Sequence, residues 1–161
     1  MDIQTSNLAL RDDYELIEGP ISLGSTSDVY RMRHKDWQQD MALKLPRIEY
    51  ISDPRRREDF RRECCLWVDL GLHPHIVQCY YVQEHNGETC VFSEWCSDST
   101  LSAVIANGSL YEGTPAQQLD NVLSVALQVM LGIEYSHRCG VVHKDIKPDN
   151  ILIAEGGCAK I

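Results

Sequence analysis

Much of the first half of the chain consists of apolar, β-former-rich runs interrupted by glycine and proline, which is the pattern of β-strands. Residues 14–33 are strand-like with glycine-containing interruptions, and residues 41–45 form a short apolar run stopped by Pro46. Two further runs rich in β-formers, 76–84 and 90–95, flank Asn86-Gly87, a strong signal for a hairpin turn. The first half therefore predicts several strands, two of them joined in a hairpin.

Two segments follow the helical period instead. Asp53 supplies a capping carboxylate and Pro54 suits the first helical position, so a helix is predicted over residues 54–70, ending at Gly71. A second helix is predicted over about residues 118–137, with apolar positions three or four residues apart. These positions predict one buried face, made of Leu119, Val122, Ala126, Val129, Ile133 and His137.

The order of these elements predicts an α+β fold. Strands come first, then one helix, then the hairpin, and the remainder is mostly helical. Residues 1–13 are polar with weak periodicity and are expected to be a leader or linker. The pattern is therefore a sheet-rich front followed by a mainly helical back.

Composition narrows the range of functions. The net charge of −9 argues against general nucleic-acid binding, because phosphate backbones attract proteins of the opposite sign. No apolar run approaches the roughly 20 residues that a membrane-spanning helix requires. The first residues lack the basic and apolar regions of a signal peptide, so a cytoplasmic location is expected.

The seven cysteines do not form a metal-binding or disulfide pattern. No C-x-x-C pair occurs, and an odd number of cysteines argues against a closed disulfide framework. Zinc requires clustered ligands, whereas adjacent Cys64 and Cys65 diverge on a helix, and Pro74 separates His73 from His75. We expect reduced thiols that act as small apolar residues.

The stretch from His143 to Asn150 carries the clearest chemistry. Asp145 precedes Asn150 by five residues, in a loop between the second helix and a short apolar strand. In phosphoryl transfer, such an aspartate would accept or orient the proton of an attacking hydroxyl, and the amide oxygen of Asn150 would bind a metal ion. Lys147 would steady the charge on the transferring phosphoryl group.

This stretch, His-Lys-Asp-Ile-Lys-Pro-Asp-Asn, resembles the catalytic loop of the protein kinase family, and Lys147-Pro148 resembles its serine/threonine class. The resemblance implies a two-lobed fold in which an antiparallel five-stranded sheet with one helix precedes a helical lobe. Residues 14–96 would be the N-terminal lobe and hinge, and 97–161 the first part of the C-terminal lobe. It implies Asp145 as catalytic base, Asn150 as a Mg²⁺ ligand, and ATP and a protein serine or threonine as substrates.

Upstream residues extend the resemblance to the nucleotide. Lys44, in Met-Ala-Leu-Lys, resembles the strand lysine that holds the α- and β-phosphates, and Ala42 resembles a residue packing on adenine. Glu63 shares a helix face with Phe60 and Trp67 by its spacing. Because a carboxylate directed at a core needs a partner, we expect Glu63 to pair with Lys44, although a solvated Glu63 at the rim is the alternative.

Residues 21–30 occupy the place of the glycine-rich loop that covers the phosphates. The family pattern G-x-G-x-x-G-x-V is matched by Gly24 and Val29, with serine replacing the outer glycines. The resemblance therefore places Ile21, Ser22, Gly24, Ser27 and Val29 at the nucleotide, with a looser hold on ATP. A plain turn is the alternative interpretation.

The hinge of the family is matched by Ser93-Glu94-Trp95-Cys96. The resemblance implies that backbone groups of Glu94 and Cys96 meet the adenine edge and that Ser93 is a small gatekeeper. It also implies Leu152 as part of the floor under the adenine. A strand end without a ligand is the alternative.

Two features depart from ordinary expectation. Lys144 stands where most family members carry arginine, and lysine cannot grip a phosphate bidentately, which leaves control by activation-loop phosphorylation open. Five arginines crowd the start of the first helix, either as a solvated face or as a docking site for an acidic partner. They are Arg55, Arg56, Arg57, Arg61 and Arg62.

After Ile161 a member of this family would continue into Asp-Phe-Gly, whose aspartate is the principal Mg²⁺ ligand. We therefore expect these 161 residues to belong to a longer parent kinase and to be inactive, or nearly so, alone. The apolar face of the second helix would then favour aggregation. Two other functions remain open: a non-catalytic kinase-like module that binds nucleotide or partners, and a small-molecule phosphotransferase of the same fold.

Overall fold

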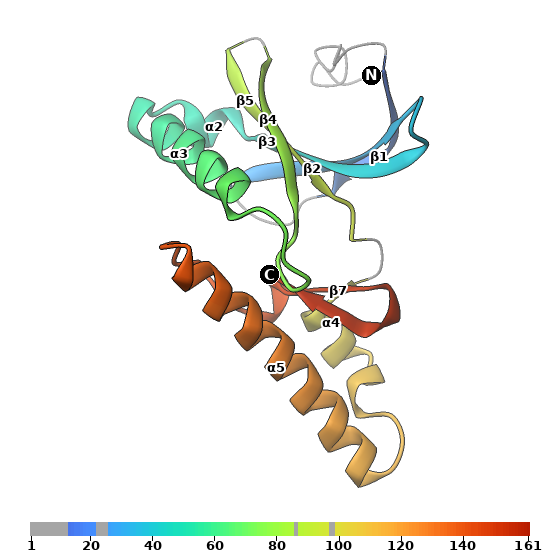
Figure 1. The fold of residues 1–161 in the computed structure, drawn as a ribbon. Helices are drawn as coiled ribbons and strands as arrows, with labels where there is room; N and C mark the ends of the chain where they lie inside the picture. Colours follow the sequence, from blue (N-terminus) through green and yellow to red (C-terminus); the bar gives the residue numbers. More distant parts are fainter. Residues whose placement is uncertain (1–12, 22–25, 86, 97–98) are drawn as a thin grey trace. The chain divides into compact units, whose positions relative to one another are not determined.

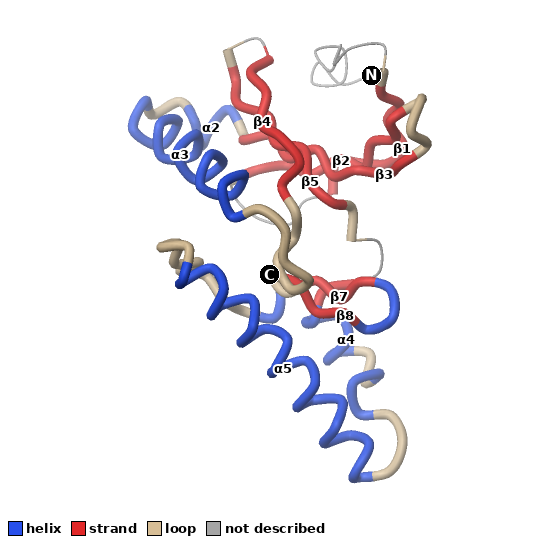
Figure 2. Tube along the Cα trace, in the orientation of Figure 1, coloured by secondary structure: helices blue, strands red, loops and turns tan. Residues whose placement is uncertain are grey.

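The chain divides into two compact units, Met1–Val68 with Cys79–Trp95, and Asp69–Gln78 with Cys96–Ile161. The structure is a computed structural model that describes residues 13–21, 26–85, 87–96 and 99–161 (Figure 1). In the first unit a helix accompanies an antiparallel sheet, and in the second a long helix accompanies a small sheet (Figure 2). This is the α+β architecture predicted from the order of the elements.

The sheet of the first unit has five strands in the order β1-β2-β3-β5-β4. Every neighbouring pair is antiparallel, and β3 lies in the middle, paired with β2 on one side and β5 on the other. The turn between β4 and β5 falls at the predicted hairpin position, where Asn86 lies outside the described residues and Gly87 has φ 80°. The strands are β1 (Tyr14–Ile21), β2 (Ser27–His34), β3 (Gln39–Pro46), β4 (Cys79–His85) and β5 (Glu88–Glu94).

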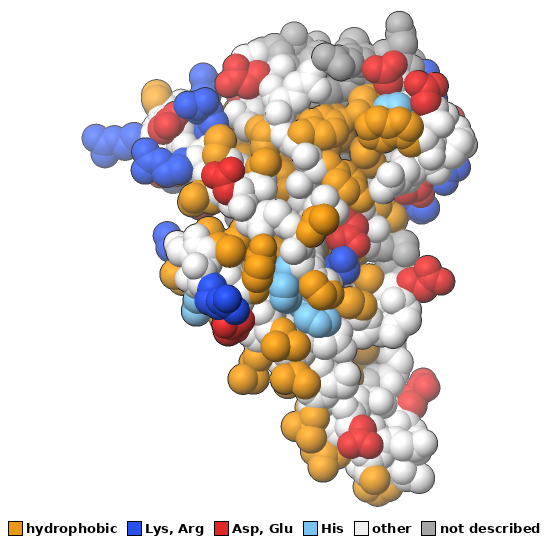
Figure 3. All heavy atoms as spheres, in the orientation of Figure 1, with side chains coloured by type: hydrophobic (Ala, Val, Ile, Leu, Met, Phe, Trp, Pro, Cys, Tyr) orange, Lys and Arg blue, Asp and Glu red, His pale blue; other side chains and the backbone are white. Residues whose placement is uncertain are grey.

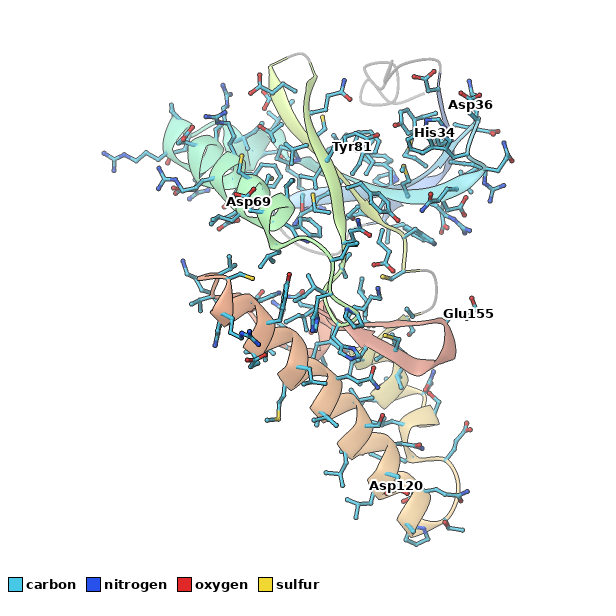
Figure 4. All side chains as sticks on the ribbon, viewed as in Figure 1. His34, Asp36, Asp69, Tyr81, Asp120 and Glu155 are labelled. Atoms are coloured by element: carbon cyan, nitrogen blue, oxygen red, sulfur yellow. The ribbon has the colours of Figure 1, made fainter. Side chains whose placement is uncertain are left out.

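One face of this sheet is an apolar core. Its buried members are Tyr30, Met32, Met41, Leu43, Cys90 and Phe92. Aromatic side chains add to it: Tyr14 packs 5.1 Å from Phe92 and edge-on against His34, and Tyr81 stacks on Phe92 at 4.7 Å between ring centroids. Figure 4 labels His34 on β2 and Tyr81 on β4. This core holds the central strand in place, so the residues between its core positions point to the other face.

The predicted first helix is α3 (Pro54–Leu70), with its ends where the sequence signals placed them. The Asp53 carboxylate accepts a hydrogen bond from the Arg55 amide at 2.9 Å, and Gly71 has φ 66°, the left-handed conformation of a helix C-terminus. A short helix, α2 (Ile48–Ile51), precedes it and was not predicted.

The helix α3 packs on the sheet through Phe60 and Cys64, which contact Cys79 and Val91. Burial raises the pKa of Cys64 to about 12 and that of Cys79 to about 11, so both thiols stay protonated and act as small apolar groups. All seven cysteines are free, which agrees with the expectation drawn from their spacing.

The second unit is built on α5 (Pro115–Arg138), with Asp120 near its start (Figure 4). Thr114 caps this helix in a capping box with Gln117, so it begins three residues before the predicted start. Three short strands form a sheet in the order β6-β7-β8. The remaining elements are β6 (Ser99–Thr100), α4 (Leu101–Ala106), η1 (Ser109–Tyr111), η2 (Pro148–Asn150), β7 (Leu152–Ala154), η3 (Glu155–Gly157) and β8 (Cys158–Lys160).

The predicted strand at 76–84 is too long at its start, because β4 begins only at Cys79. The residues before it bond to the end of the chain instead: the Val77 amide donates to the Ile161 carbonyl at 2.9 Å, and the Ile161 amide donates to the His75 carbonyl at 3.1 Å. The His75 carbonyl also lies against Gly132 of α5, where an added Cβ would be 2.5 Å from its oxygen. Glycine at this position permits the close approach of helix and loop.

The buried face predicted for α5 is partly wrong. Val129 is buried and Ile133 is half-buried, but Leu119, Val122, Ala126 and His137 are exposed. Gly132 and Ser136 are buried on this side instead, and at Gly132 a larger side chain would meet the His75 carbonyl in the loop before β4. The exposed large apolar residues of α5 are Leu119, Val122, Leu123, Leu127, Met130 and Leu131. No helix in the described ranges is long and apolar enough to cross a bilayer.

The contact at Gly132 generates a stability prediction. Gly132→Ala would normally stabilise a helix, but here the new methyl group meets a backbone carbonyl, so we expect a loss of about 1–3 kcal/mol, as in other overpacked sites. Thermal unfolding followed by circular dichroism measures the effect, with Ser124→Ala on the exposed side of α5 as the control. A rise in the unfolding midpoint of Gly132→Ala would contradict the packing described.

His73 generates a prediction about pH. Its ring stacks on Tyr135 at 4.4 Å, and its Nδ1 accepts a hydrogen bond from the His75 amide at 3.2 Å, so the ring is neutral. Burial lowers the pKa of His73 below 6.5, the nearby His75 lowers it further, and Glu134 acts in the opposite direction. A lowered pKa means that the stability contributed by neutral His73 is present above pH 6.5 and is lost as the pH falls through the folded-state value.

We therefore expect the unfolding midpoint to fall on acidification below about pH 6.5 and the His73→Asn variant, whose amide oxygen can replace Nδ1 as the acceptor, to lose part of this dependence. Urea unfolding across the range from about pH 5 to pH 8 measures it. His137→Asn, on the exposed end of α5, serves as the control and should keep the wild-type dependence. Identical pH profiles for His73→Asn and wild type would refute the assignment.

Candidate active site

The first group of candidate residues lies on the face of the five-stranded sheet opposite its apolar core. In the sheet register Val29 is opposite both Ile21 and Lys44, and Ala42 is opposite Ser93. Residues directly opposite one another in an antiparallel ladder project to the same face. The sheet therefore gathers Ile21, Val29, Ala42, Lys44 and Ser93, predicted from distant segments, on one surface.

Other predicted nucleotide-binding residues are near neighbours, in sequence, of the strand residues on this surface. Ser22 and Gly24 fall outside the described residues. Ser27 is buried at the start of β2, opposite Pro46, and Ser93 is buried near the end of β5. Glu94 ends β5 opposite Met41, and Cys96 is half-buried in the second unit.

Lys44 has a different neighbour from the one predicted. Its Nζ lies 5.9 Å from the centroid of the Trp67 ring, a cation–π contact worth about 0.5–1 kcal/mol where solvent has access. Glu63 is exposed, and no ion pair joins it to Lys44 within the described ranges. The expectation of an inward Glu63 paired with Lys44 is therefore wrong for this structure.

The position of Glu63 has a simple physical reason. The buried centre of α3 runs through Phe60 and Cys64, so Glu63 lies at the margin of that face. A carboxylate at a margin keeps its hydration at no cost, whereas an inward one would have to be compensated by Lys44. The aromatic ring of Trp67, on the same side of the helix, takes the place beside the ammonium group.

The second group of candidate residues is the loop at 143–150 in the second unit. The Asp145 carboxylate accepts two hydrogen bonds at Oδ2, from Lys147 Nζ at 2.9 Å and from Asn150 Nδ2 at 2.8 Å. The same Asn150 nitrogen donates to the Asp145 carbonyl at 2.9 Å, and the Asp145 amide donates to His143 Nδ1 at 3.3 Å. The three residues predicted from their spacing are thus brought together.

The geometry of this loop depends on Lys144 and on η2. Lys144 has φ 67°, the left-handed region that a non-glycine residue enters only at some cost in free energy. This turn directs the backbone amide of Asp145 toward His143 and the carboxylate toward Lys147. The single turn of η2, which starts at Pro148, brings the Asn150 side chain back to the Asp145 carboxylate.

Hydrogen bonds from Lys147 and Asn150 lower the pKa of Asp145, which is therefore ionised at neutral pH. The reciprocal contact raises the pKa of Lys147, so the pair is a carboxylate and an ammonium group. Both side chains are about half exposed or more, at 61% and 49%, so solvent screens their attraction. No hydrogen bond within the described ranges reaches the second carboxylate oxygen, Oδ1, which leaves it accessible to a ligand.

The side chain of Asn150 suits a cation through its oxygen. Its nitrogen is engaged by Asp145, so Oδ1 is the atom directed elsewhere, and an amide oxygen is a good ligand for Mg²⁺. Among the residues that the structure describes, no group of three or more histidine, cysteine, aspartate or glutamate side chains could hold a metal ion. Leu152, predicted to lie under the adenine, is half-buried in β7 between Thr100 and Lys160.

Sequence reasoning missed two functional contacts. Trp67 was assigned to the buried face of its helix, but its spacing from Glu63 could also have suggested that an aromatic ring competes for Lys44. His143 was assigned no role, although a ring nitrogen two residues before Asp145 is well placed to accept a hydrogen bond from the Asp145 amide.

The matches to known proteins include both groups of candidate residues. A family model described as the protein kinase domain matches residues 17–161. Similar curated proteins include the MAP kinase kinase kinase win1 of Schizosaccharomyces pombe, 31% identical over 147 residues, covering 88% of this chain and 10% of win1. MAP kinase kinase kinase SSK2 of Saccharomyces cerevisiae is 34% identical over 137 residues, covering 85% of this chain and 8% of SSK2.

A bacterial protein is comparably similar. The serine/threonine-protein kinase PrkC of Bacillus subtilis is 31% identical over 139 residues, covering 86% of this chain and 20% of PrkC. The chain thus spans about a tenth to a fifth of the length of these relatives. The crystal structure of Rad53 residues 1–466 in complex with AMP-PNP has the same fold, with a TM-score of 0.73 and 24% identity over 92% of this chain and 37% of that one.

The hydrogen bonds to Asp145 generate a prediction about its ionisation. Removing the ammonium group in Lys147→Met should raise the pKa of Asp145 toward its ordinary value of 3.8, because the principal group lowering it is lost while Asn150 remains. A carboxyl-carbon NMR titration of Asp145 measures the change. Lys35→Met, in the turn between β2 and β3, is the control and should leave the titration unaltered, and an unchanged pKa in Lys147→Met would contradict the contact.

Proposed function

Since the chain belongs to the protein kinase family, we propose that the complete protein containing it transfers the γ-phosphoryl group of ATP to serine or threonine hydroxyls of proteins. The observation that carries the proposal is that Lys147 and Asn150 both donate hydrogen bonds to the Asp145 carboxylate. Lys147-Pro148 and the serine/threonine kinases among the relatives support this substrate class.

Asp145 is proposed to act on the attacking hydroxyl. Its Oδ1 would accept the hydrogen bond of the substrate hydroxyl and hold one oxygen lone pair toward the γ-phosphorus. The new oxygen–phosphorus bond forms as the bond between the γ-phosphorus and the β–γ bridging oxygen breaks, and ADP departs with that electron pair. Because the pKa of Asp145 is lowered, it is a weak base, so the proton would pass to it late, after much of the phosphoryl transfer.

Lys147 is proposed to serve two functions with one ammonium group. It keeps Asp145 ionised and oriented through the 2.9 Å hydrogen bond. Its remaining protons can donate hydrogen bonds to the oxygens of the phosphoryl group during its transfer. Asn150 is proposed to hold the carboxylate with its nitrogen and to offer its oxygen to Mg²⁺. When bound, Mg²⁺ would supply charge neutralisation of the phosphate oxygens.

The sheet surface of the first unit is proposed to bind the nucleotide. Val29 and Ala42 supply apolar contact suited to the adenine ring, and Lys44 supplies a cation suited to its phosphates. The ammonium group would have to leave the Trp67 ring to reach a phosphate, which is favourable because a phosphate attracts it more strongly than an aromatic face does.

Two other functions use the same residues differently. A non-catalytic module would bind nucleotide through Lys44 without needing Asp145, and a small-molecule phosphotransferase would need Asp145 but would not phosphorylate proteins. Variants of the two residues therefore separate the alternatives.

In the complete protein we expect Asp145→Asn to retain ATP binding and to lose phosphoryl transfer by roughly a hundredfold or more, because the proton acceptor is removed and the charge opposite Lys147 is lost. Lys44→Met should weaken ATP binding itself. Thermal shift with ATP and Mg²⁺ measures binding, and incorporation of phosphate from ATP into a mixture of serine- and threonine-containing proteins measures transfer.

Asp36→Asn and Lys35→Met, both in the exposed turn after β2, are the matched controls and should behave as wild type. Full transfer activity in Asp145→Asn would refute the proposed role of this residue. ATP binding without transfer in the wild-type protein would favour the non-catalytic module, and transfer to small hydroxyl compounds alone would favour the other enzyme class.

A further inference from the structure

The start of α3 is the most basic part of a strongly acidic chain. Five of the 15 lysine and arginine residues lie within eight consecutive positions, and all five side chains are exposed. Figure 3 shows blue side chains gathered on one edge of the molecule, and Figure 1 places α3 at that edge. The residues are Arg55, Arg56, Arg57, Arg61 and Arg62.

This placement does not stabilise the helix. The N-terminal end of a helix carries partial positive charge, so acidic residues are favoured in its first turn and basic ones are disfavoured. The first turn of α3 contains no acidic residue and three arginines, Arg55, Arg56 and Arg57. The Asp53 carboxylate accepts a hydrogen bond from the Arg55 amide, but it lies before the helix and forms no ion pair with these arginines in the part of the chain that the structure describes. An arrangement that costs folding energy on an exposed surface calls for a function outside folding.

The five arginines differ in their partners. Arg57 forms an ion pair with Glu88 at 3.7 Å, Arg61 forms one with Glu58 at 3.4 Å, and Arg56 lies over the ring of Tyr50. For Arg55 and Arg62 there is no ion pair in the part of the chain that the structure describes. These two cations are therefore available to an external anion.

Arg55 and Arg62 also lie in line. Seven residues separate them, so they project from the same side of α3 about 10 Å apart, at roughly 1.5 Å per residue. Leu66, four residues beyond Arg62, continues the line and is 43% exposed. Phe60 and Cys64 point to the opposite side, into the packing against the sheet. We use "α3 ridge" for Arg55, Arg62 and Leu66.

We propose that the α3 ridge is a docking surface for an acidic peptide segment of a partner protein, with two carboxylates for Arg55 and Arg62 and an apolar side chain for Leu66. In the polyproline II conformation a peptide has three residues per turn and rises about 3.1 Å per residue, so acids three residues apart project from one side about 9 Å apart and match the two arginines. An apolar residue three positions later projects from the same side, toward Leu66. The complementary pattern is acid-x-x-acid-x-x-apolar.

The ridge fits a narrow peptide better than a broad anionic surface. Glu58 and Asp59 lie on either side of the line between the two arginines, so anions spread over a membrane would meet these carboxylates as well. The chain as a whole carries a net charge of −9 and would be repelled by such a surface. A single extended peptide can follow the ridge without covering Glu58 and Asp59 on its two sides.

The experiment measures fluorescence anisotropy of a labelled peptide containing Glu-Ser-Ser-Glu-Ser-Ser-Leu, titrated with the complete protein that contains this chain. Two control peptides replace both glutamates by glutamine, or leucine by serine. The ridge variant carries Arg55→Glu and Arg62→Glu. A matched variant with the same change in net charge carries Lys35→Glu and Arg138→Glu, at exposed positions outside α3.

We expect the ridge variant to bind at least about tenfold more weakly and the matched variant to bind like wild type. Binding should weaken between about 50 and 300 mM salt, and the glutamine peptide should not bind. Thermal unfolding distinguishes loss of binding from loss of folding: Arg55→Glu places an acid in the first turn, so the ridge variant should unfold at the same temperature or higher.

Three outcomes would overturn the proposal. They are equal weakening in the ridge and matched variants, no peptide binding by the wild-type protein up to about 1 mM, and ridge-dependent binding only to vesicles containing phosphatidylserine. The readout involves no phosphoryl transfer, so its result is independent of the proposed enzymatic function.

Discussion

The register of β3 between β2 and β5 is the constraint on which the candidate nucleotide surface depends. In this register Met41 and Leu43 belong to the apolar core, and Ala42 and Lys44 belong to the opposite face. A slip by one residue would bury the lysine and expose the core positions, which costs several kcal/mol on each side. Pairing on both edges of β3 opposes such a slip, so the position of the cation is fixed by the packing of its apolar neighbours.

The loop at 143–150 is organised by a different kind of interaction. Asp145 lies in an exposed loop, where apolar packing contributes little, and its orientation comes from short hydrogen bonds to residues two and five positions later. Local bonds of this kind hold a carboxylate while leaving one oxygen accessible, as a group that receives a substrate must be. The left-handed Lys144 is the local cost of this arrangement, and the bonds at Asp145 offset it.

The features that sequence reasoning predicted well are those specified by neighbouring residues. The ends of α3 follow from Asp53, Pro54 and Gly71, and the cluster at Asp145 follows from spacings of two and five residues. The start of β4 could not be predicted, because the residues before it pair with Ile161, more than eighty positions away. The buried side of α5 was missed for the same reason: Gly132 packs against His75, and periodicity does not reveal a partner that needs a small residue.

Glu63 shows why a family pattern is not sufficient to place a side chain. Its spacing from Phe60 and Trp67 puts it on the margin of the buried face, where a rotation of the helix by a few tens of degrees decides between a solvated acid and a buried ion pair. The two arrangements differ by small, opposing terms: the attraction of Lys44 for a carboxylate, the desolvation of both charges, and the contact of Lys44 with Trp67. Residue types alone do not rank terms of similar size. A bound triphosphate would change that balance, because it adds further negative charge beside Lys44.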